Sequence, residues 1–142
     1  MKNEIMIGAD AIAMFCRLQM NFKKDMPIRS SEMGVLIFIQ KQNSDVTPLM
    51  ISNFFNIAKP SVTSTLNALI KKEYIEKIPS AKDRRSYTVN LTNKGKQLVE
   101  STHKEHFKLM DILVEKMGYD DFNKFINLIQ KANSILSEGN RR

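Results

Sequence analysis

Residues 82–95 read KDRRSYTVNLTNKG, and this stretch decides the expected fold. Its charged start, at Lys82 to Arg85, is typical of an exposed turn. Tyr87, Val89 and Leu91 then alternate with polar residues, which is the pattern of a β-strand with one buried face. Thr92 follows as a residue type that caps helix N-termini. The stretch therefore predicts the tip and returning strand of a β-hairpin that presents arginines, followed by a helix.

Two short helices are expected just before this hairpin. Thr47 and Pro48 place a capping hydroxyl ahead of a proline, as where a helix begins. Asn56 tolerates the left-handed conformation that the turn of a helix-turn-helix needs. Pro60 suits the first turn of the next helix. A helix-turn-helix followed by a hairpin predicts a winged helix, a fold class that is mainly α with a small β-hairpin wing.

The helix expected at about residues 59–72 has two different faces. Its apolar stripe consists of Val62, Leu66, Leu69 and Ile70. The opposite face carries small polar and basic residues without a carboxylate: Lys59, Ser61, Thr63, Ser64, Asn67 and Lys71. A merely solvated face normally mixes both signs of charge, so this composition favours contact with an anionic groove.

The other elements follow from periodicity and caps. We expect a helix at about residues 4–22, a second one capped by Ser30 or Ser31, and strands at 74–78 and 85–91. A long helix should begin after Gly95 and end at Gly118, and a last helix should span about 120–136, before a polar tail at 138–142. The first and last helices carry more apolar surface than a winged module needs to cover. We therefore expect a homodimer. The length of the chain suits one domain, over residues 1–142.

Composition narrows the functional classes. The chain has 142 residues with 22 basic against 15 acidic side chains, a net charge of +7 that fits a polyanionic partner. Cys16 is the single cysteine, and two histidines make no convincing metal set, so neither a disulfide nor a metal or other cofactor is expected. A glycine-rich phosphate loop, zinc-ligand spacing and a Ser-His-Asp set are all missing, which argues against an enzyme. No long apolar run occurs, so we expect no membrane association and a cytoplasmic protein.

The motif Asp83-Arg84-Arg85 followed by Leu91-Thr92-x-x-Gly95 resembles the MarR family of transcriptional regulators, as does the segment at 57–63. The resemblance implies a winged helix-turn-helix at about 30–95, with dimerisation helices at about 4–22 and 105–137. It further implies a repressor that binds double-stranded DNA at a pseudo-palindromic operator. Ala58 departs from the family, which often has a capping Ser or Thr there.

The resemblance also implies roles for the candidate residues. The helix at 59–72 enters the major groove, and Arg84 or Arg85 reaches the minor groove. Asp83 would repel phosphates, so we expect it to pair with Arg85 and brace the hairpin tip, leaving Arg84 for DNA. A surface pair without function is the alternative. Asn67 alone offers a bidentate contact to adenine, whereas Lys59, Lys71 and Lys72 are expected at phosphates.

Two questions stay open in the sequence. Family members bind small aromatic or anionic effectors between the dimer helices and the winged module. Candidates for lining such a site are Met14, Phe15, Met20, Met33 and Phe38, but ordinary core packing is the favoured interpretation of the methionines. Arg17 is either an anchor for an anionic effector or a solvated charge, and no effector-binding residue is assigned. Peroxide sensors of the family carry a cysteine near the place of Cys16, but all three tyrosines lie in the later half, so a plain buried thiol is favoured. A winged module that contacts protein instead of DNA is the remaining alternative.

Overall fold

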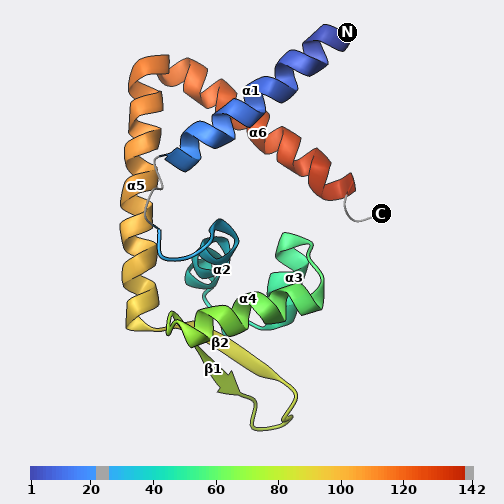
Figure 1. The fold of residues 1–142 in the computed structure, drawn as a ribbon, viewed down its shortest axis with the longest axis vertical. Helices are drawn as coiled ribbons and strands as arrows, with labels where there is room; N and C mark the ends of the chain where they lie inside the picture. Colours follow the sequence, from blue (N-terminus) through green and yellow to red (C-terminus); the bar gives the residue numbers. More distant parts are fainter. Residues whose placement is uncertain (22–25, 140–142) are drawn as a thin grey trace.

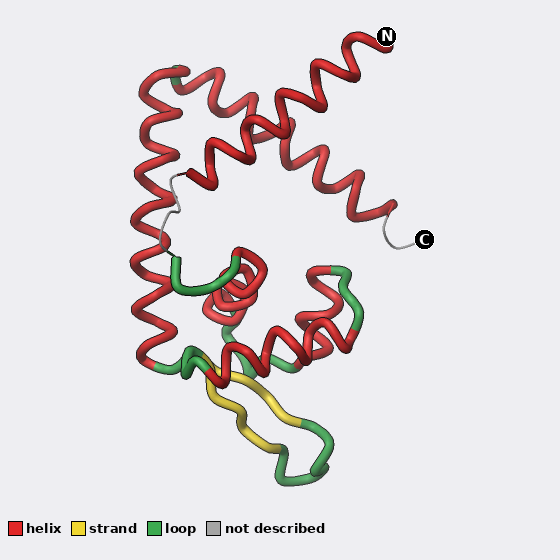
Figure 2. Tube along the Cα trace, in the orientation of Figure 1, coloured by secondary structure: helices red, strands yellow, loops and turns green. Residues whose placement is uncertain are grey.

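The computed structural model describes residues 1–21 and 26–139, which form helices and one antiparallel β-hairpin. The elements, in chain order, are α1 (Lys2–Asn21), α2 (Ser30–Lys41), α3 (Pro48–Phe55), α4 (Lys59–Lys71), β1 (Ile75–Pro79), β2 (Tyr87–Leu91), α5 (Asn93–Met117) and α6 (Tyr119–Gly139). The long helix α5 connects a winged module at one end to the crossed helices α1 and α6 at the other (Figure 1). Figure 2 shows the hairpin projecting beyond α4, away from α1 and α6. The predicted fold class, mainly α with a hairpin wing, is confirmed.

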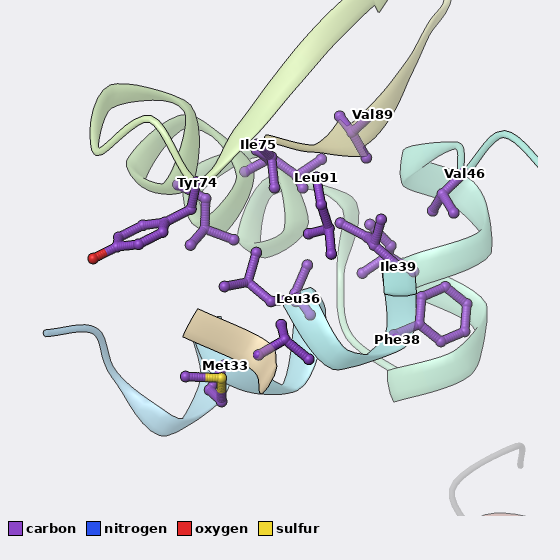
Figure 3. Close-up of a cluster of buried hydrophobic side chains, with 14 of the residues drawn as sticks. Met33, Leu36, Phe38, Ile39, Val46, Tyr74, Ile75, Val89 and Leu91 are labelled. Atoms are coloured by element: carbon purple, nitrogen blue, oxygen red, sulfur yellow. The ribbon is translucent and has the colours of Figure 1, made fainter. Parts of the chain in front are cut away.

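The winged module has its own hydrophobic core. Leu36 of α2, Ile51 of α3, Leu66 of α4 and Val89 of β2 are all completely buried. Figure 3 shows side chains from α2 and the hairpin meeting in this cluster. The Val89 amide donates to the carbonyl of Val46 at 2.9 Å, which ties the hairpin to the segment before α3. The predicted alternation in β2 and the stripe on α4 are therefore both confirmed as core-facing patterns.

Local signals explain where α3 and α4 begin and end. The Met50 amide donates to the Thr47 hydroxyl at 3.2 Å, so Thr47 caps α3 as predicted. Asn56 adopts φ 55° and ψ 46°, the left-handed conformation expected for the turn. Pro60 lies in the first turn of α4, and Ala58 precedes it as an N-cap that offers no side-chain hydrogen bond. The helix-turn-helix thus enters α4 through a weakly capped end.

Several predicted boundaries were wrong. Helix α5 begins at Asn93 and not after Gly95, because Thr92 caps it. Helix α2 is preceded by Arg29 as N-cap, rather than by Ser30 or Ser31, because the Arg29 amide donates to the Glu32 carboxylate at 2.8 Å. Strand β1 starts and ends one residue later than predicted, at Ile75–Pro79. Strand β2 starts at Tyr87 and not at residue 85, since the arginines belong to the turn. Residue 22 and the last part of the expected polar tail, 140–142, lie outside the described residues.

The junction between the hairpin and α5 explains the Leu-Thr-x-x-Gly pattern. The Thr92 hydroxyl accepts from the Gly95 amide at 3.1 Å, as an N-cap, and donates to the carbonyl of Glu73 at 2.6 Å. The Thr92 amide donates to the carbonyl of Tyr74 at 3.1 Å. A Cβ at position 95 would collide with that same carbonyl oxygen. Glycine is required because the first turn of α5 approaches the backbone before β1 too closely for any side chain.

Helices α1 and α6 cross at the far end of α5 (Figure 1). The rings of Phe15 and Phe125 meet edge to face there, with centroids 5.3 Å apart. Gly118, with φ 91°, ends α5 as predicted and allows the chain to turn into α6. No residue of α6 is buried in the single chain. These two helices therefore leave most of their apolar side chains exposed.

Candidate nucleic-acid interface

The outward face of α4 carries the predicted polar and basic residues. All six of them, from Lys59 to Lys71, are exposed, while Val62, Leu66 and Leu69 face the core. Ser64, Asn67 and Lys71 recur at spacings of three and four and therefore follow one line along the helix. Ser61 and Thr63 lie on opposite flanks of that line. The helix thus presents a continuous surface of hydrogen-bonding groups without a carboxylate.

Hydrogen bonds within α4 decide which groups remain available. The Thr63 hydroxyl donates to the carbonyl of Lys59 at 3.1 Å, so it can serve an external partner only as an acceptor. The Thr65 hydroxyl is likewise used, on the carbonyl of Ser61 at 3.0 Å. Among the described residues, the side chains of Ser61, Ser64 and Asn67 have no such partner. These three can therefore both donate and accept toward a ligand.

The hairpin tip is a compact turn built around Asp83. The Ser86 amide donates to the Asp83 carbonyl at 3.1 Å, which places Arg84 and Arg85 at the two central positions of the turn. The Asp83 carboxylate accepts from the Arg85 amide at 3.0 Å and from the Ser86 hydroxyl at 3.3 Å. Aspartate favours the first position of such turns because it can accept these bonds. The predicted ion pair between the Asp83 and Arg85 side chains is not formed in the described chain.

The two arginines consequently face different surroundings. Arg85 lines an open hollow of about 420 Å³ between α3, α4 and the wing, and Lys59 lines it as well. The remaining lining residues are neutral: Thr47, Pro48, Leu49, Val62, Ser86 and Tyr87. Two cations around one hollow without an acid concentrate positive potential beside the start of α4. Arg84 stands outside this hollow, exposed at the corner of the turn.

Sequence reasoning missed one charged residue of this region. Glu32 is only 4% exposed, and both of its carboxylate oxygens lie 3.4 Å from the Lys72 ammonium. Lys72, expected at a phosphate, is therefore engaged with α2. The sequence does place an acid three residues after Arg29, the spacing of a capping box, and this could have indicated a role for Glu32 at the start of α2. Its pairing with Lys72 depends on the fold, which brings these distant residues together.

The proposed effector-lining residues are divided among different places. Met20 and Met33 line a cavity of about 520 Å³ between α1, α2 and α5, together with Arg29 and Thr102. Phe38 instead lines a smaller hollow with Phe54 and Phe55. Met14 and Arg17 are exposed on α1, and Phe15 packs on α6. The sequence candidates thus do not form one site.

Cys16 is exposed, so the expectation of a buried thiol was wrong for the single chain. Helix α1 packs on α6 through Phe15, whereas the neighbouring Cys16 is exposed. Within residues 1–21 and 26–139, no group of three or more His, Cys, Asp or Glu side chains is placed to bind a metal ion. Nor does any helix of that part combine the length and the apolarity needed to cross a membrane.

Comparison with known proteins tests the resemblance directly. Residues 25–86 match a model of the MarR family. The HTH-type transcriptional regulator BilQ of Clostridioides difficile is 30% identical over 134 residues, which cover 87% of this chain and 89% of that protein.

Two solved structures share the fold. FabT of Streptococcus pneumoniae in complex with DNA superposes with a TM-score of 0.78 at 23% identity, over 94% of this chain and 96% of that one. A mutant of MarR from E. coli complexed with operator DNA has a TM-score of 0.74 at 22% identity, over 92% and 96%. The chain belongs to the MarR family of winged-helix, DNA-binding transcriptional regulators, and so to a family of regulators rather than enzymes.

Proposed function

We propose that this regulator is a homodimeric repressor that binds a pseudo-palindromic operator in double-stranded DNA. One observation carries the proposal: the exposed face of α4 has no acid and continues into the hollow lined by Lys59 and Arg85. An α-helix fits the major groove, and a cationic wing beside it fits the adjacent backbone and minor groove. The DNA complexes of FabT and of the MarR mutant support this use of the fold.

The geometry suggests a division of labour among the site residues. Asn67 lies on the central line of α4 and has the amide that binds adenine bidentately, with Ser64 beside it and Ser61 and Thr63 on the flanks. Lys59 and Lys71 mark the two ends of α4, where they neutralise phosphates. We assign Arg84, at the corner of the turn, to the minor groove. We assign Arg85, which lines the same hollow as Lys59, to the phosphate between the two grooves.

The exposed apolar faces of α1 and α6 support the proposed dimerisation. On α1, Ile5 and Ile12 are 67% and 68% exposed, and on α6 Leu128 and Leu136 are 64% and 67% exposed. Contiguous apolar surface of this kind marks an interface in a protein that is otherwise well packed. We propose one domain over residues 1–142, in which 30–95 bind DNA and the regions 4–22 and 105–137 interlock with a second copy.

Release by a small effector is the regulatory part of the proposal. The cavity between α1, α2 and α5 lies where the dimer helices meet the winged module. Met20 and Met33 give it an adaptable apolar wall, and Arg29 gives it a cation for an anionic group. We propose that a small aromatic or anionic molecule bound here alters the spacing of the two α4 helices and so releases the operator.

Selection of bound sequences from a random duplex library tests the main proposal. We expect a pseudo-palindrome with half-sites about one DNA turn apart, and sedimentation of a dimer at micromolar concentration. Replacing Lys59, Lys71 and Arg84 together by alanine should abolish the salt-sensitive binding. If no sequence is selected from the library, a winged module that contacts protein is favoured instead. Binding that survives the triple change would refute the assignment of these three cations to the DNA interface.

The exposure of Cys16 gives a second regulatory candidate. A thiol that is exposed on α1 can be oxidised, and oxidation at the proposed dimer helices would disturb the dimer. Operator binding is measured before and after mild peroxide treatment, with Cys16→Ser as control. Sensitivity that disappears in the control assigns oxidation sensing to this residue, and equal binding in all four samples rules it out.

A further inference from the structure

Glu32 is the one acidic side chain that is buried in the described residues. A buried carboxylate is costly unless hydrogen bonds and an opposite charge compensate it. Here the Arg29 amide donates to one oxygen at 2.8 Å, and the Lys72 ammonium lies 3.4 Å from both oxygens. The carboxylate therefore connects the first turn of α2 with the residue that follows α4, across 40 positions of sequence.

The end of α4 is bound from a second side by α5. The carbonyl of Lys72 accepts from the Lys94 ammonium at 2.8 Å, and the carbonyl of Glu73 accepts from the Thr92 hydroxyl at 2.6 Å. Glu73 itself has φ 66°, so the chain reverses sharply at this point. Two elements of the core thus restrain the same few residues at the C-terminal end of the recognition helix.

The opposite end of α4 is held differently, by the packing of Val62, which is 1% exposed, and by the Ser52 hydroxyl, which donates to the carbonyl of Ile57 at 2.7 Å. Ala58 contributes no side-chain cap, and residues 56–61 are all exposed. A helix of 13 residues is about 20 Å long, so a tilt of about 10° about its C-terminal end moves the other end by about 3 Å. That displacement equals the length of a hydrogen bond and is enough to break contacts with bases.

We propose that Glu32 is a positioning residue for operator recognition. Its ion pair with Lys72 sets the tilt of α4 against α2, and this inference rests on the proposed use of α4 as the recognition helix. Glu32 touches no DNA. Lys72 acts through Glu32: its ammonium pairs with this carboxylate and does not bind a phosphate.

The experiment compares Glu32→Gln, Lys72→Met and the double variant with the wild-type dimer. Glutamine keeps an acceptor for the Arg29 amide and removes only the charge. The matched control is Glu100→Gln with Lys104→Met, two exposed charged side chains four residues apart on α5, between the regions proposed for DNA binding and for dimerisation. For each protein, affinity is measured against the selected operator and an unrelated duplex over a series of salt concentrations.

We expect each single change to weaken operator binding by about tenfold, and the double change to weaken it no further, because both remove one interaction. Affinity for the unrelated duplex and the salt slope of Lys72→Met should stay at wild-type values. The control pair should leave both affinities unchanged. A positioning residue should lower the preference for the operator over the unrelated duplex and leave the salt dependence of binding unchanged. The loss of a phosphate contact would instead lower the salt dependence.

The opposite pattern would overturn the inference. If Lys72 bound a phosphate, Glu32→Gln would free it and leave operator affinity equal or higher, while Lys72→Met would weaken all duplexes and flatten the salt slope. Lys72 is 43% exposed at its side chain, so Lys72→Met decides the question even if Glu32→Gln does not fold. If the wild-type protein bound the operator no more tightly than the unrelated duplex, the proposed function would fail as well. This outcome can be told apart from a failure of the Glu32 inference alone, in which the wild-type protein still prefers its operator.

Discussion

Replacing Lys71 by alanine should weaken binding to every DNA sequence by the same factor. Lys71 lies at the C-terminal end of the exposed line of α4, and no intramolecular partner uses its ammonium in the described chain. On the proposed function, its removal subtracts a phosphate contact and leaves base contacts in place. The free energy of unfolding should stay unchanged, because the side chain is exposed.

The magnitude follows from the number of cations at the interface. Each protomer presents Lys59, Lys71, Arg84 and Arg85. A dimer that uses all of them, with Arg84 contributing its charge from the minor groove, neutralises about eight phosphate charges and has a salt slope near −7. Between 50 and 200 mM salt, affinity then falls by about 20,000-fold. Lys71→Ala removes two contacts per dimer, which brings the slope to about −5 and the fall to about 2,000-fold.

Fluorescence anisotropy with labelled operator and unrelated duplexes measures these slopes. Lys104→Ala on α5 is the matched control, since it removes the same charge from an exposed helix away from the wing. Its slope should remain close to that of the wild type. An unchanged slope for Lys71→Ala, or a loss confined to one sequence, would refute the assignment of Lys71 to a phosphate.

Three other changes test single contacts. Asn67→Ala should relax base preference at one operator position, by about 1–3 kcal/mol on the preferred base, in a repeated library selection; equal loss on all sequences would contradict this. Thr92→Ala should lower the free energy of unfolding in urea by about 2 kcal/mol, because it removes both the cap and the bond to the preceding turn, whereas Thr92→Ser should retain most of it. Gly95→Ala should destabilise by about 1–3 kcal/mol through its clash with the Tyr74 carbonyl, and an unchanged thermal midpoint would show that α5 can shift away.

The elements that local chemistry specifies were predicted well. Thr47 and Thr92 cap their helices, and Asn56 takes the left-handed turn, because each depends on hydrogen bonds or sterics within a few residues. The outward face of α4 followed from periodicity alone. Arg29 was missed as N-cap because its own side chain has no capping role and the bond comes from Glu32.

The sequence by itself determined the order of the elements, the turn chemistry and the acid-free face of α4, since these arise from residues close together in the chain. Only the tertiary structure decided that Arg85 shares a hollow with Lys59, and that Lys72 pairs with Glu32. The approach of Gly95 to the Tyr74 carbonyl was also decided there. Such contacts depend on how α2, α4, α5 and the wing pack around one core, and no spacing within any single element contains that information.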